Sequence, residues 1–206
     1  MFISFEGTEG VGKTTLIKSL VDYLQQQGKQ VVLTREPGGT PLAEQIRQLL
    51  LSPQDEAMSE NCELLLIFAA RAQHIAQVIQ PALNAGQWVL SDRFIDASFA
   101  YQGGGRGLNV DTIELLRQQF VPVMPHLTFW LDAPVELGMQ RAQKRGALDR
   151  FEQEKLEFFQ KVRTVYQSRA FAEPERFIRL DASQTPAQIL EQAIAVLKQN
   201  QLLTSN

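Results

Sequence analysis

The chain has 206 residues, of which 44% are hydrophobic and 21% charged, and its formal net charge is −3. These values are ordinary for a globular domain, and the slight acidic excess argues against a broad footprint for nucleic acid or an anionic membrane. We therefore expect neither a nucleic acid nor a membrane as a partner.

The single cysteine, Cys62, excludes an internal disulfide and a cysteine-rich zinc site. It stands in the apolar run CELLLIF, which favours burial in the core over a reactive thiol. No basic and then apolar leader precedes the first strand-like run, and no apolar run approaches the roughly 20 residues of a membrane span. The expected location is the cytoplasm.

Strand-like and helix-like segments alternate along the first half of the chain. Proline is poorly tolerated inside a helix, so a bend is expected where one interrupts a helical pattern. In order, apolar spacing and turn residues predict a strand at 2–6, a glycine-rich loop, a helix at 13–27, a strand at 30–34, a helix at about 42–51, a helix at 59–85 bent near Pro81, and a strand at 87–91.

The second half continues the alternation. It predicts a short helix after Arg93 that breaks at 103–105, a helix at 110–120, a strand at 127–131, helices at about 135–144 and 152–170, a strand at 176–181 and a last helix at about 186–198. Strands separated by helices imply a parallel sheet covered on both faces. The expected fold class is α/β, with three layers built on a five-stranded parallel sheet. It forms one domain over residues 1–206, with a mobile lid at about 142–151.

The loop after the first strand matches the phosphate-loop pattern G-x-x-x-x-G-K-[ST] over residues 7–14, GTEGVGKT. Its glycines let backbone N–H groups wrap phosphates, and the following helix adds its positive dipole end. Lys13 is expected to reach the β- and γ-phosphates, and Thr14 to ligate Mg²⁺. The expected phosphate contacts are Gly7, Thr8, Glu9, Gly10, Val11, Gly12, Lys13, Thr14 and Thr15. The other acid of this stretch, Glu6, is expected to be structural.

The type of phosphate-loop protein can be narrowed further. A guanine-reading N-K-x-D segment is absent from the sequence, which disfavours a GTPase, and the short acidic chain disfavours a translocating ATPase. A small-molecule kinase needs an acceptor pocket and a cation for the charge that develops during transfer.

Asp92 and Arg93 end a predicted strand, where open α/β sheets place ligands. Asp92 is placed to lie near Mg²⁺, and the planar fork of Arg93 can clamp a phosphoryl group.

Five segments, taken together and in this order, resemble bacterial thymidylate kinases: FEGTEGVGKTT, TREPGGTPLAEQIR, FAARAQH, SDRFIDASFAYQGGGRG and RGALDRFE. They extend to about residue 170, and the last 35 residues carry no specific motif. The resemblance implies transfer of the γ-phosphate of ATP to dTMP, giving dTDP and ADP, by a homodimer packed through helices. A kinase for another nucleoside monophosphate and a regulatory nucleotide-binding module are the alternatives.

The resemblance also implies the acceptor-side contacts. They are Arg71 and Arg93 on the monophosphate, Arg47 on the other wall, Ser98 and Gln102 on the thymine edge, Tyr101 over the deoxyribose, Pro37 near the 5-methyl group and Glu9 facing the sugar. Arg35 is expected either to hold its loop or to approach phosphate.

The base-stacking position departs from the family pattern. That pattern places an aromatic residue four positions before Arg71, where this chain has Ile67, whereas Phe68 lies three positions before. Residues three and four positions before Arg71 both lie on the same helix face as Arg71. We expect Phe68 to stack on the base, with Ile67 as the alternative.

Residues 141–150, RAQKRGALDR, concentrate cations between two predicted helices. A lid there would exclude water and bring cations to the phosphates. The resemblance implies that Arg145 is the transition-state cation, that Arg141 packs against adenine and that Arg150 lies near the phosphates. Some relatives carry an arginine at the position of Gly10. This chain has no arginine there, so the lid is the expected source of the catalytic cation. The expected catalytic residues are Lys13, Arg93, Arg145 and Glu9.

Overall fold

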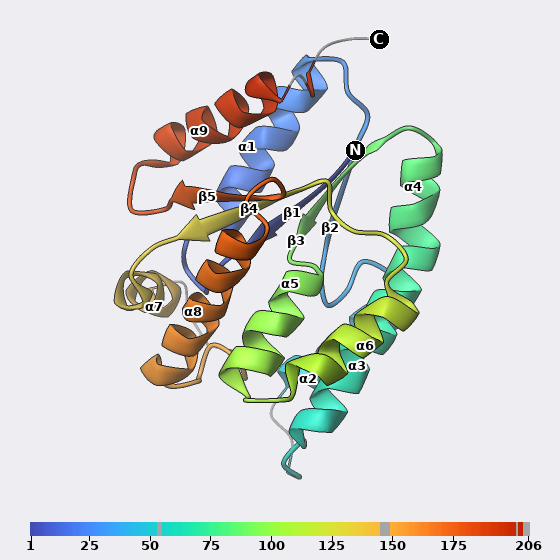
Figure 1. Cartoon of the computed structure of the whole chain (residues 1–206), viewed down its shortest axis with the longest axis vertical. Helices are drawn as coiled ribbons and strands as arrows, with labels where there is room; N and C mark the ends of the chain where they lie inside the picture. The colour runs from blue at the N-terminus through green and yellow to red at the C-terminus, as the bar shows by residue number, and fades with distance from the viewer. Residues whose placement is uncertain (53–54, 145–148, 201, 204–206) are drawn as a thin grey trace.

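A five-stranded parallel sheet in the order β2-β3-β1-β4-β5 forms the centre of the computed structural model (Figure 1). The structure describes residues 1–52, 55–144, 149–200 and 202–203. The strands are β1 (Phe2–Glu6), β2 (Val31–Arg35), β3 (Trp88–Asp92), β4 (Leu127–Asp132) and β5 (Phe177–Asp181). The prediction of a five-stranded parallel sheet is confirmed, and each strand end lies within one residue of its expected place.

The central strands are apolar without alternation because both faces of the sheet are covered. Every residue of β1 and β4 is buried, as expected for a parallel sheet between two helix layers. The register aligns Phe5 of β1 with Asp92 of β3 and with Phe129 of β4. The carboxyl ends of these three strands therefore meet at one edge, where α/β sheets bind ligands.

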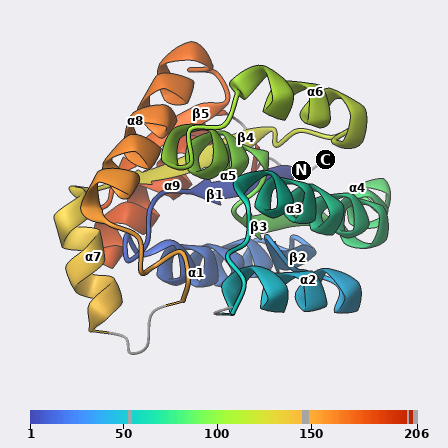
Figure 2. The same ribbon diagram turned by 90° about the horizontal axis from the view of Figure 1, so that it is seen from below.

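Helices cover the two faces of the sheet in separate layers (Figures 1 and 2). One core lies between the sheet and the pair α1 (Lys13–Gln26) and α9 (Pro186–Gln199). The other face is covered by α3 (Glu60–His74), α5 (Ile95–Ser98), α6 (Val110–Phe120) and α8 (Leu156–Ala172). Helix α2 (Pro41–Leu51) packs against α3, and α7 (Val135–Gln143) contacts α8.

The long helix that follows α2 is irregular where a bend was expected. α3 continues through a π-helical segment, η1 (Ile75–Ile79), into α4 (Gln80–Asn84). The π-helical turns directly precede Pro81, whose ring and missing N–H disturb the α-helical ladder of the preceding turn.

The span Glu60–Asn84 has the length and mean hydropathy, 1.3, of a membrane-crossing helix, with half of the relevant window buried. This corrects the expectation that no run of that kind exists. The helix nevertheless carries Glu63, Arg71 and His74 as buried side chains, each with hydrogen-bond partners inside the protein. A core helix fits this pattern, because buried charges require partners.

The glycines at 103–105 do not break the helix, contrary to expectation. The chain passes from α5 into a π-helical segment, η2 (Phe99–Gly105). A Cβ on Gly104 would stand 2.6 Å from Val165, and one on Gly105 would stand 2.4 Å from the Phe158 ring. These glycines therefore allow η2 to approach α8 closely.

Two further expectations were wrong. Cys62 is exposed, because the core-facing positions of α3 begin one residue later, at Glu63 and Leu64. Helix α8 begins at Leu156 instead of residue 152. The Asp149 carboxylate accepts from the backbone N–H groups of Phe151 and Glu152, both at 2.9 Å, and such local bonds compete with a helical start.

Candidate active site

Two cavities meet at the carboxyl ends of β1 and β3. The inner pocket, with about 550 Å³ of empty space, is lined by Glu9, Glu36, Pro37, Arg47, Leu51, Ile67, Arg71, Arg93, Phe94, Ala97, Ser98, Tyr101, Gln102, Asp149 and Phe151. The outer groove is lined by Glu9, Gly10, Val11, Gly12, Lys13, Thr14, Thr15, Leu16, Arg35, Arg47, Asp92, Arg93, Arg141, Asp149, Glu152, Gln184, Pro186 and Ile189. Four residues line both cavities: Glu9, Arg47, Arg93 and Asp149.

The predicted phosphate loop forms the floor of the outer groove. Lys13 lies buried at the start of α1, and its ammonium donates to the carbonyls of Gly7 at 3.0 Å and Thr8 at 2.9 Å. Burial, with the nearby charge of Arg93, lowers the pKa of Lys13 to about 8. The loop backbone thus holds the cation at the groove before any phosphate arrives.

Gly10 explains why this loop has no base at its centre. Its φ is +70°, and a Cβ there would stand 2.0 Å from the carbonyl oxygen of Gly138 in α7. A Cβ on Gly138 would in turn stand 2.5 Å from the carbonyl oxygen of Glu9. The loop and α7 are in direct backbone contact, so a side chain such as arginine has no room at position 10.

Arg93 occupies an unusual backbone conformation at the junction of the two cavities. Its φ is 69°, in the left-handed region that non-glycine residues rarely adopt. Two hydrogen bonds hold this turn: Arg93 N donates to Phe5 O at 3.0 Å, and Ser91 Oγ donates to Arg93 O at 2.7 Å. The strained turn directs the guanidinium back over the phosphate loop.

Glu9, the acid inside the phosphate loop, faces Arg93 and Tyr101. Arg93 Nη2 lies 2.6 Å from Glu9 Oε1, and the Tyr101 hydroxyl lies 2.9 Å from each Glu9 oxygen. Burial raises the pKa of Tyr101 well above its usual value of 10, so the hydroxyl is a neutral donor. The carboxylate is therefore compensated by an arginine and a phenol at the junction.

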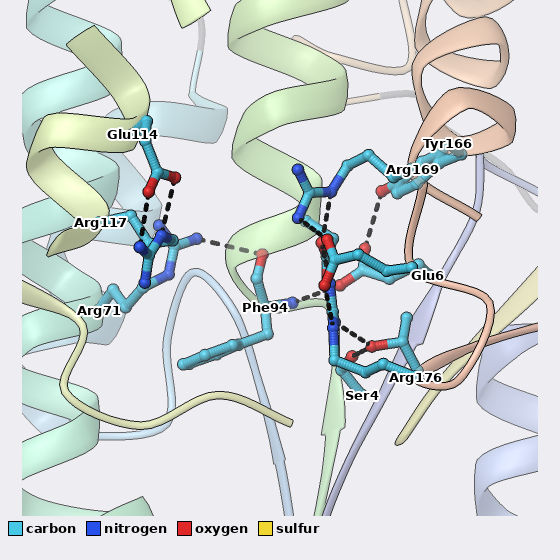
Figure 3. Close-up of polar contacts among 12 residues, drawn as sticks. Ser4, Glu6, Arg71, Phe94, Glu114, Arg117, Tyr166, Arg169 and Arg176 are labelled. Atoms are coloured by element: carbon cyan, nitrogen blue, oxygen red, sulfur yellow. Dashed lines mark hydrogen bonds and ion pairs between the residues drawn. The ribbon is translucent and has the colours of Figure 1, made fainter. Parts of the chain in front are cut away.

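Glu6 holds the same turn through Phe94, the residue after Arg93 (Figure 3). Its carboxyl accepts from Phe94 N at 2.8 Å and from the Tyr166 hydroxyl at 2.8 Å. Burial, with the neighbouring charge of Asp96, raises the pKa of Glu6 to about 8. The expectation of a structural role fits these contacts. The hydrogen bonds that connect Tyr166 of α8 through Glu6 to Phe94, however, have no signal in the sequence.

Arg71 is fixed at the back of the inner pocket. Its Nε donates to Glu36 Oε2 at 2.7 Å and its Nη1 to Ser98 Oγ at 3.0 Å. Its Nη2 donates to Phe94 O at 3.3 Å, a contact drawn in Figure 3. Glu36 also lies 3.0 Å from His74 Nδ1. Glu36 was not predicted as a site residue. Its position between Arg35 and Pro37, two residues for which the sequence predicted a role, could have indicated Glu36 as a site residue.

The structure separates the two candidates for the base-stacking position. Ile67 lines the inner pocket. Phe68 is 4% exposed and packs in the second core cluster, with the Arg71 guanidinium 5.0 Å from its ring centre. The helix turn of about 100° per residue accounts for the difference. Ile67 lies four residues from Arg71 and shares its pocket-facing side, whereas Phe68 is turned toward the sheet.

The loop at 36–40 is held by arginines on both sides. Arg47 Nη1 donates to Pro37 O at 2.9 Å, and the Glu36–Pro37 peptide is cis. Arg35 pairs with Glu44 at 3.0 Å, and Glu44 also accepts from Gly39 N at 3.0 Å. Of the two roles expected for Arg35, holding the loop is the one that these contacts show.

The two lid arginines that the structure describes, Arg141 and Arg150, lie in different places. Arg145 lies outside the described residues. Arg141 lines the outer groove and donates to Ala182 O at 3.1 Å. Arg150 instead donates to Leu50 O and to Glu63 Oε2, both at 2.7 Å. It thus contacts α2 and α3, and it is not among the residues that line the inner pocket or the outer groove.

Asp92 and Thr14 both line the outer groove and could hold a magnesium ion. Asp92 Oδ1 is buried and has no hydrogen-bond partner among the residues that the structure describes. Within the same residues, no cluster of three or more His, Cys, Asp or Glu side chains forms a closed metal site. One carboxylate and one hydroxyl beside a phosphate loop suit Mg²⁺, which keeps waters and phosphate oxygens as its other ligands.

The fold and the site together define a class of protein. A phosphate loop between β1 and α1 opens on a groove, and a pocket with fixed arginines adjoins that groove. This arrangement is that of a phosphate-loop kinase acting on a small anionic acceptor.

Comparison with known proteins identifies the family within this class. The family model described as thymidylate kinase matches residues 5–194. The chain is 67% identical to a thymidylate kinase of Acinetobacter baumannii over 96% of this chain and 100% of that protein. It is 57% identical to one of Pseudomonas putida, over 96% and 95%. A crystal structure of thymidylate kinase from Ehrlichia chaffeensis superposes with a TM-score of 0.79 at 34% identity, covering 96% of this chain and 98% of that one. The chain belongs to the thymidylate kinase family, whose enzymes are ATP-dependent phosphotransferases.

Proposed function

We propose that the chain transfers the γ-phosphate of ATP to dTMP, giving dTDP and ADP. The observation that carries the proposal is the meeting of the inner pocket and the outer groove at Glu9 and Arg93. A donor phosphate on the loop and an acceptor phosphate in the pocket would meet there. Positioning of this kind supplies much of the catalysis in phosphoryl transfer.

The inner pocket takes dTMP in this proposal. Arg71 and Arg93 bind its phosphate, with Arg47 on the opposite wall. Tyr101 and Glu9 face the deoxyribose, where the carboxylate can accept from the 3′-hydroxyl. The base lies between Ile67 and the loop at Pro37, near the 5-methyl group, and Ser98 and Gln102 read its edge. Ile67 takes the base-facing role expected of Phe68, because Ile67 is the residue on the pocket wall.

The outer groove takes ATP. The loop residues and Lys13 bind its phosphates, and Arg141 borders the adenine. Thr14 and Asp92 would hold Mg²⁺, which screens phosphate charge when bound. Arg145 is proposed as the cation that stabilises the transferring group, because the contact between Gly10 and Gly138 leaves no room for a base in the loop.

A coupled ADP-release assay with ATP and magnesium tests the function against a panel of dTMP, dUMP, dCMP, UMP and GMP. The expected result is the highest kcat/KM for dTMP. Equal turnover of dCMP or GMP would instead support a kinase for another nucleoside monophosphate. No turnover of any monophosphate would support a regulatory nucleotide-binding module.

We further propose a cytoplasmic homodimer that packs through helices. Large apolar side chains stand at least half exposed on three neighbouring helices: Leu42 and Leu49 on α2, Leu65 on α3, and Val110, Leu115 and Phe120 on α6. Figure 2 shows these helices along one side of the molecule, and α3 contacts both of the others. Exposed apolar side chains gathered on neighbouring helices are typical of an interface.

A further inference from the structure

Glu63 is a buried carboxylate on which two cations and an amide converge. It lies in the first turn of α3 and is 1% exposed. Its Oε1 accepts from Gln102 Nε2 at 2.9 Å and from Arg106 Nε at 3.2 Å, and its Oε2 accepts from Arg150 Nη2 at 2.7 Å. The two guanidiniums supply the positive charge that a buried carboxylate requires.

This contact fixes the orientation of the Gln102 side chain. A carboxylate can only accept hydrogen bonds, so the end of the amide that meets Glu63 must be the NH₂ group. Gln102 is 2% exposed and lines the inner pocket. With Nε2 engaged by Glu63, the amide end left for the pocket is the oxygen, which is an acceptor.

Ser98 presents the opposite polarity on the same wall. Its hydroxyl oxygen accepts from Arg71 Nη1 at 3.0 Å, and the side chain is fully buried against the inner pocket. The hydroxyl also carries one proton, which it can donate toward the pocket that Ser98 lines. The wall offers one acceptor and one donor, each oriented by a neighbouring charged group.

That pair of groups distinguishes pyrimidines when the acceptor meets N3 of the base and the donor meets position 4. Thymine presents the N3–H donor and the O4 acceptor in this order, whereas cytosine presents the N3 acceptor and the N4 amino donor. We propose that Glu63 is a specificity-determining residue: by holding the NH₂ end of Gln102, it keeps an acceptor facing N3 of the base, opposite the Ser98 donor at O4, and so excludes cytosine nucleotides. It acts through Gln102 and is a positioning residue. The proposal rests on the function proposed above.

The test is Glu63→Gln, with kcat/KM measured for dTMP, dCMP and dUMP at saturating ATP. A neutral amide at position 63 can meet either end of Gln102, so Gln102 can turn its NH₂ group toward the base. The ratio of kcat/KM for dTMP over dCMP is expected to fall at least about tenfold, because a polar pocket rejects a base mainly by leaving buried groups unpaired. The ratio for dTMP over dUMP should not change, because uracil has the same edge.

Glu154→Gln is the matched control. Glu154 pairs with Arg106 but does not contact Gln102, so both ratios should stay at their wild-type values. Glu63→Asp is the second variant, should Glu63→Gln fail to fold. It keeps the charge for Arg106 and Arg150 but withdraws the carboxylate from Gln102, and the dTMP over dCMP ratio should again fall.

Two results would overturn the proposal. One is an unchanged dTMP over dCMP ratio in the folded Glu63 variants, which includes an equal loss for all three nucleotides, and the other is the same shift in Glu154→Gln. Wild-type turnover of dTMP in the same experiment tests the proposed function separately, because that function can stand while the role of Glu63 fails.

Discussion

Glu6 holds the turn that carries Arg93, and it does so as a fully buried carboxyl group. Its pKa is about 8 in the folded chain, against an ordinary value of 4.5. Between these two pH values the folded state keeps a proton that the unfolded state releases. The contribution of Glu6 to the free energy of unfolding is therefore fully present below about pH 4.5 and is lost as the pH rises through about 8.

Glu6→Gln should reduce this pH dependence, because the amide can accept from Phe94 N without titrating. Relative to wild type, the variant should gain at least about 1.4 kcal/mol of unfolding free energy between about pH 5 and pH 8, the equivalent of one pKa unit. Urea denaturation across that range measures the difference. Parallel curves for the two proteins would show that burial of Glu6 is not linked to protonation.

Arg145→Ala tests the proposed source of the catalytic cation. Loss of a transition-state arginine should lower kcat by roughly 10³ or more. The KM for dTMP should change little, because the arginines proposed to bind the acceptor phosphate are Arg71 and Arg93. Lys144→Ala removes the neighbouring lid charge and serves as the control, with kcat near the wild-type value. A large loss of dTMP affinity in Arg145→Ala would contradict the assignment.

At single residues, the sequence predicts the site best where a motif fixes the backbone. Lys13, Glu9 and Arg93 follow from their places after β1 and β3, because strand ends and glycine turns leave few orientations. Glu63 was missed, although it precedes Ile67 and Arg71 by four and eight residues on one helix face. An acid at that spacing within an apolar run was the available signal. The partners of Glu63 come from the η2 region and the lid, which are distant in sequence, so the local pattern around Glu63 does not indicate them.

At the scale of elements, the packing of α7 on the phosphate loop provides a direct test. Alanine ordinarily stabilises a helix relative to glycine by up to about 1 kcal/mol. Gly138→Ala should do the reverse and cost about 1–3 kcal/mol, because its Cβ would overlap Glu9 O and force the loop or the helix to move. Denaturation and the KM for ATP measure the effect. A more stable variant with unchanged kinetics would exclude tight coupling between the loop and α7.

The element boundaries that the sequence misplaced have two physical causes. The η2 segment depends on contacts between distant residues, such as the approach of Gly105 to Phe158, whereas the start of α8 is delayed by the local hydrogen bonds of Asp149. Local propensity predicts that glycine ends a helix. It carries no information about a neighbouring helix whose close packing requires glycine. The three central strands, β1, β3 and β4, were predicted closely because burial on both faces makes them largely apolar runs.

At the scale of the whole molecule, the helix face formed by α2, α3 and α6 should govern assembly. Leu115→Glu places a charge at an exposed apolar position of α6 and should shift the mass in solution from twice the 23.2 kDa chain mass toward once that value. Light scattering coupled to gel filtration measures the change. Phe171→Glu, on α8 and outside this face, should leave the mass unchanged. A monomeric wild-type protein would exclude the dimer.

The lining of the inner pocket also determines how an acceptor enters it. Three arginines, Arg47, Arg71 and Arg93, face three carboxylates, Glu9, Glu36 and Asp149, so the formal charges of the described lining cancel. A pocket without net charge exerts little long-range attraction on anions in general. Nucleotide capture then depends on short-range geometry more than on electrostatic steering. Abundant cellular phosphates that lack a fitting base gain little from entering, and the acceptor site is protected from simple competition by anions.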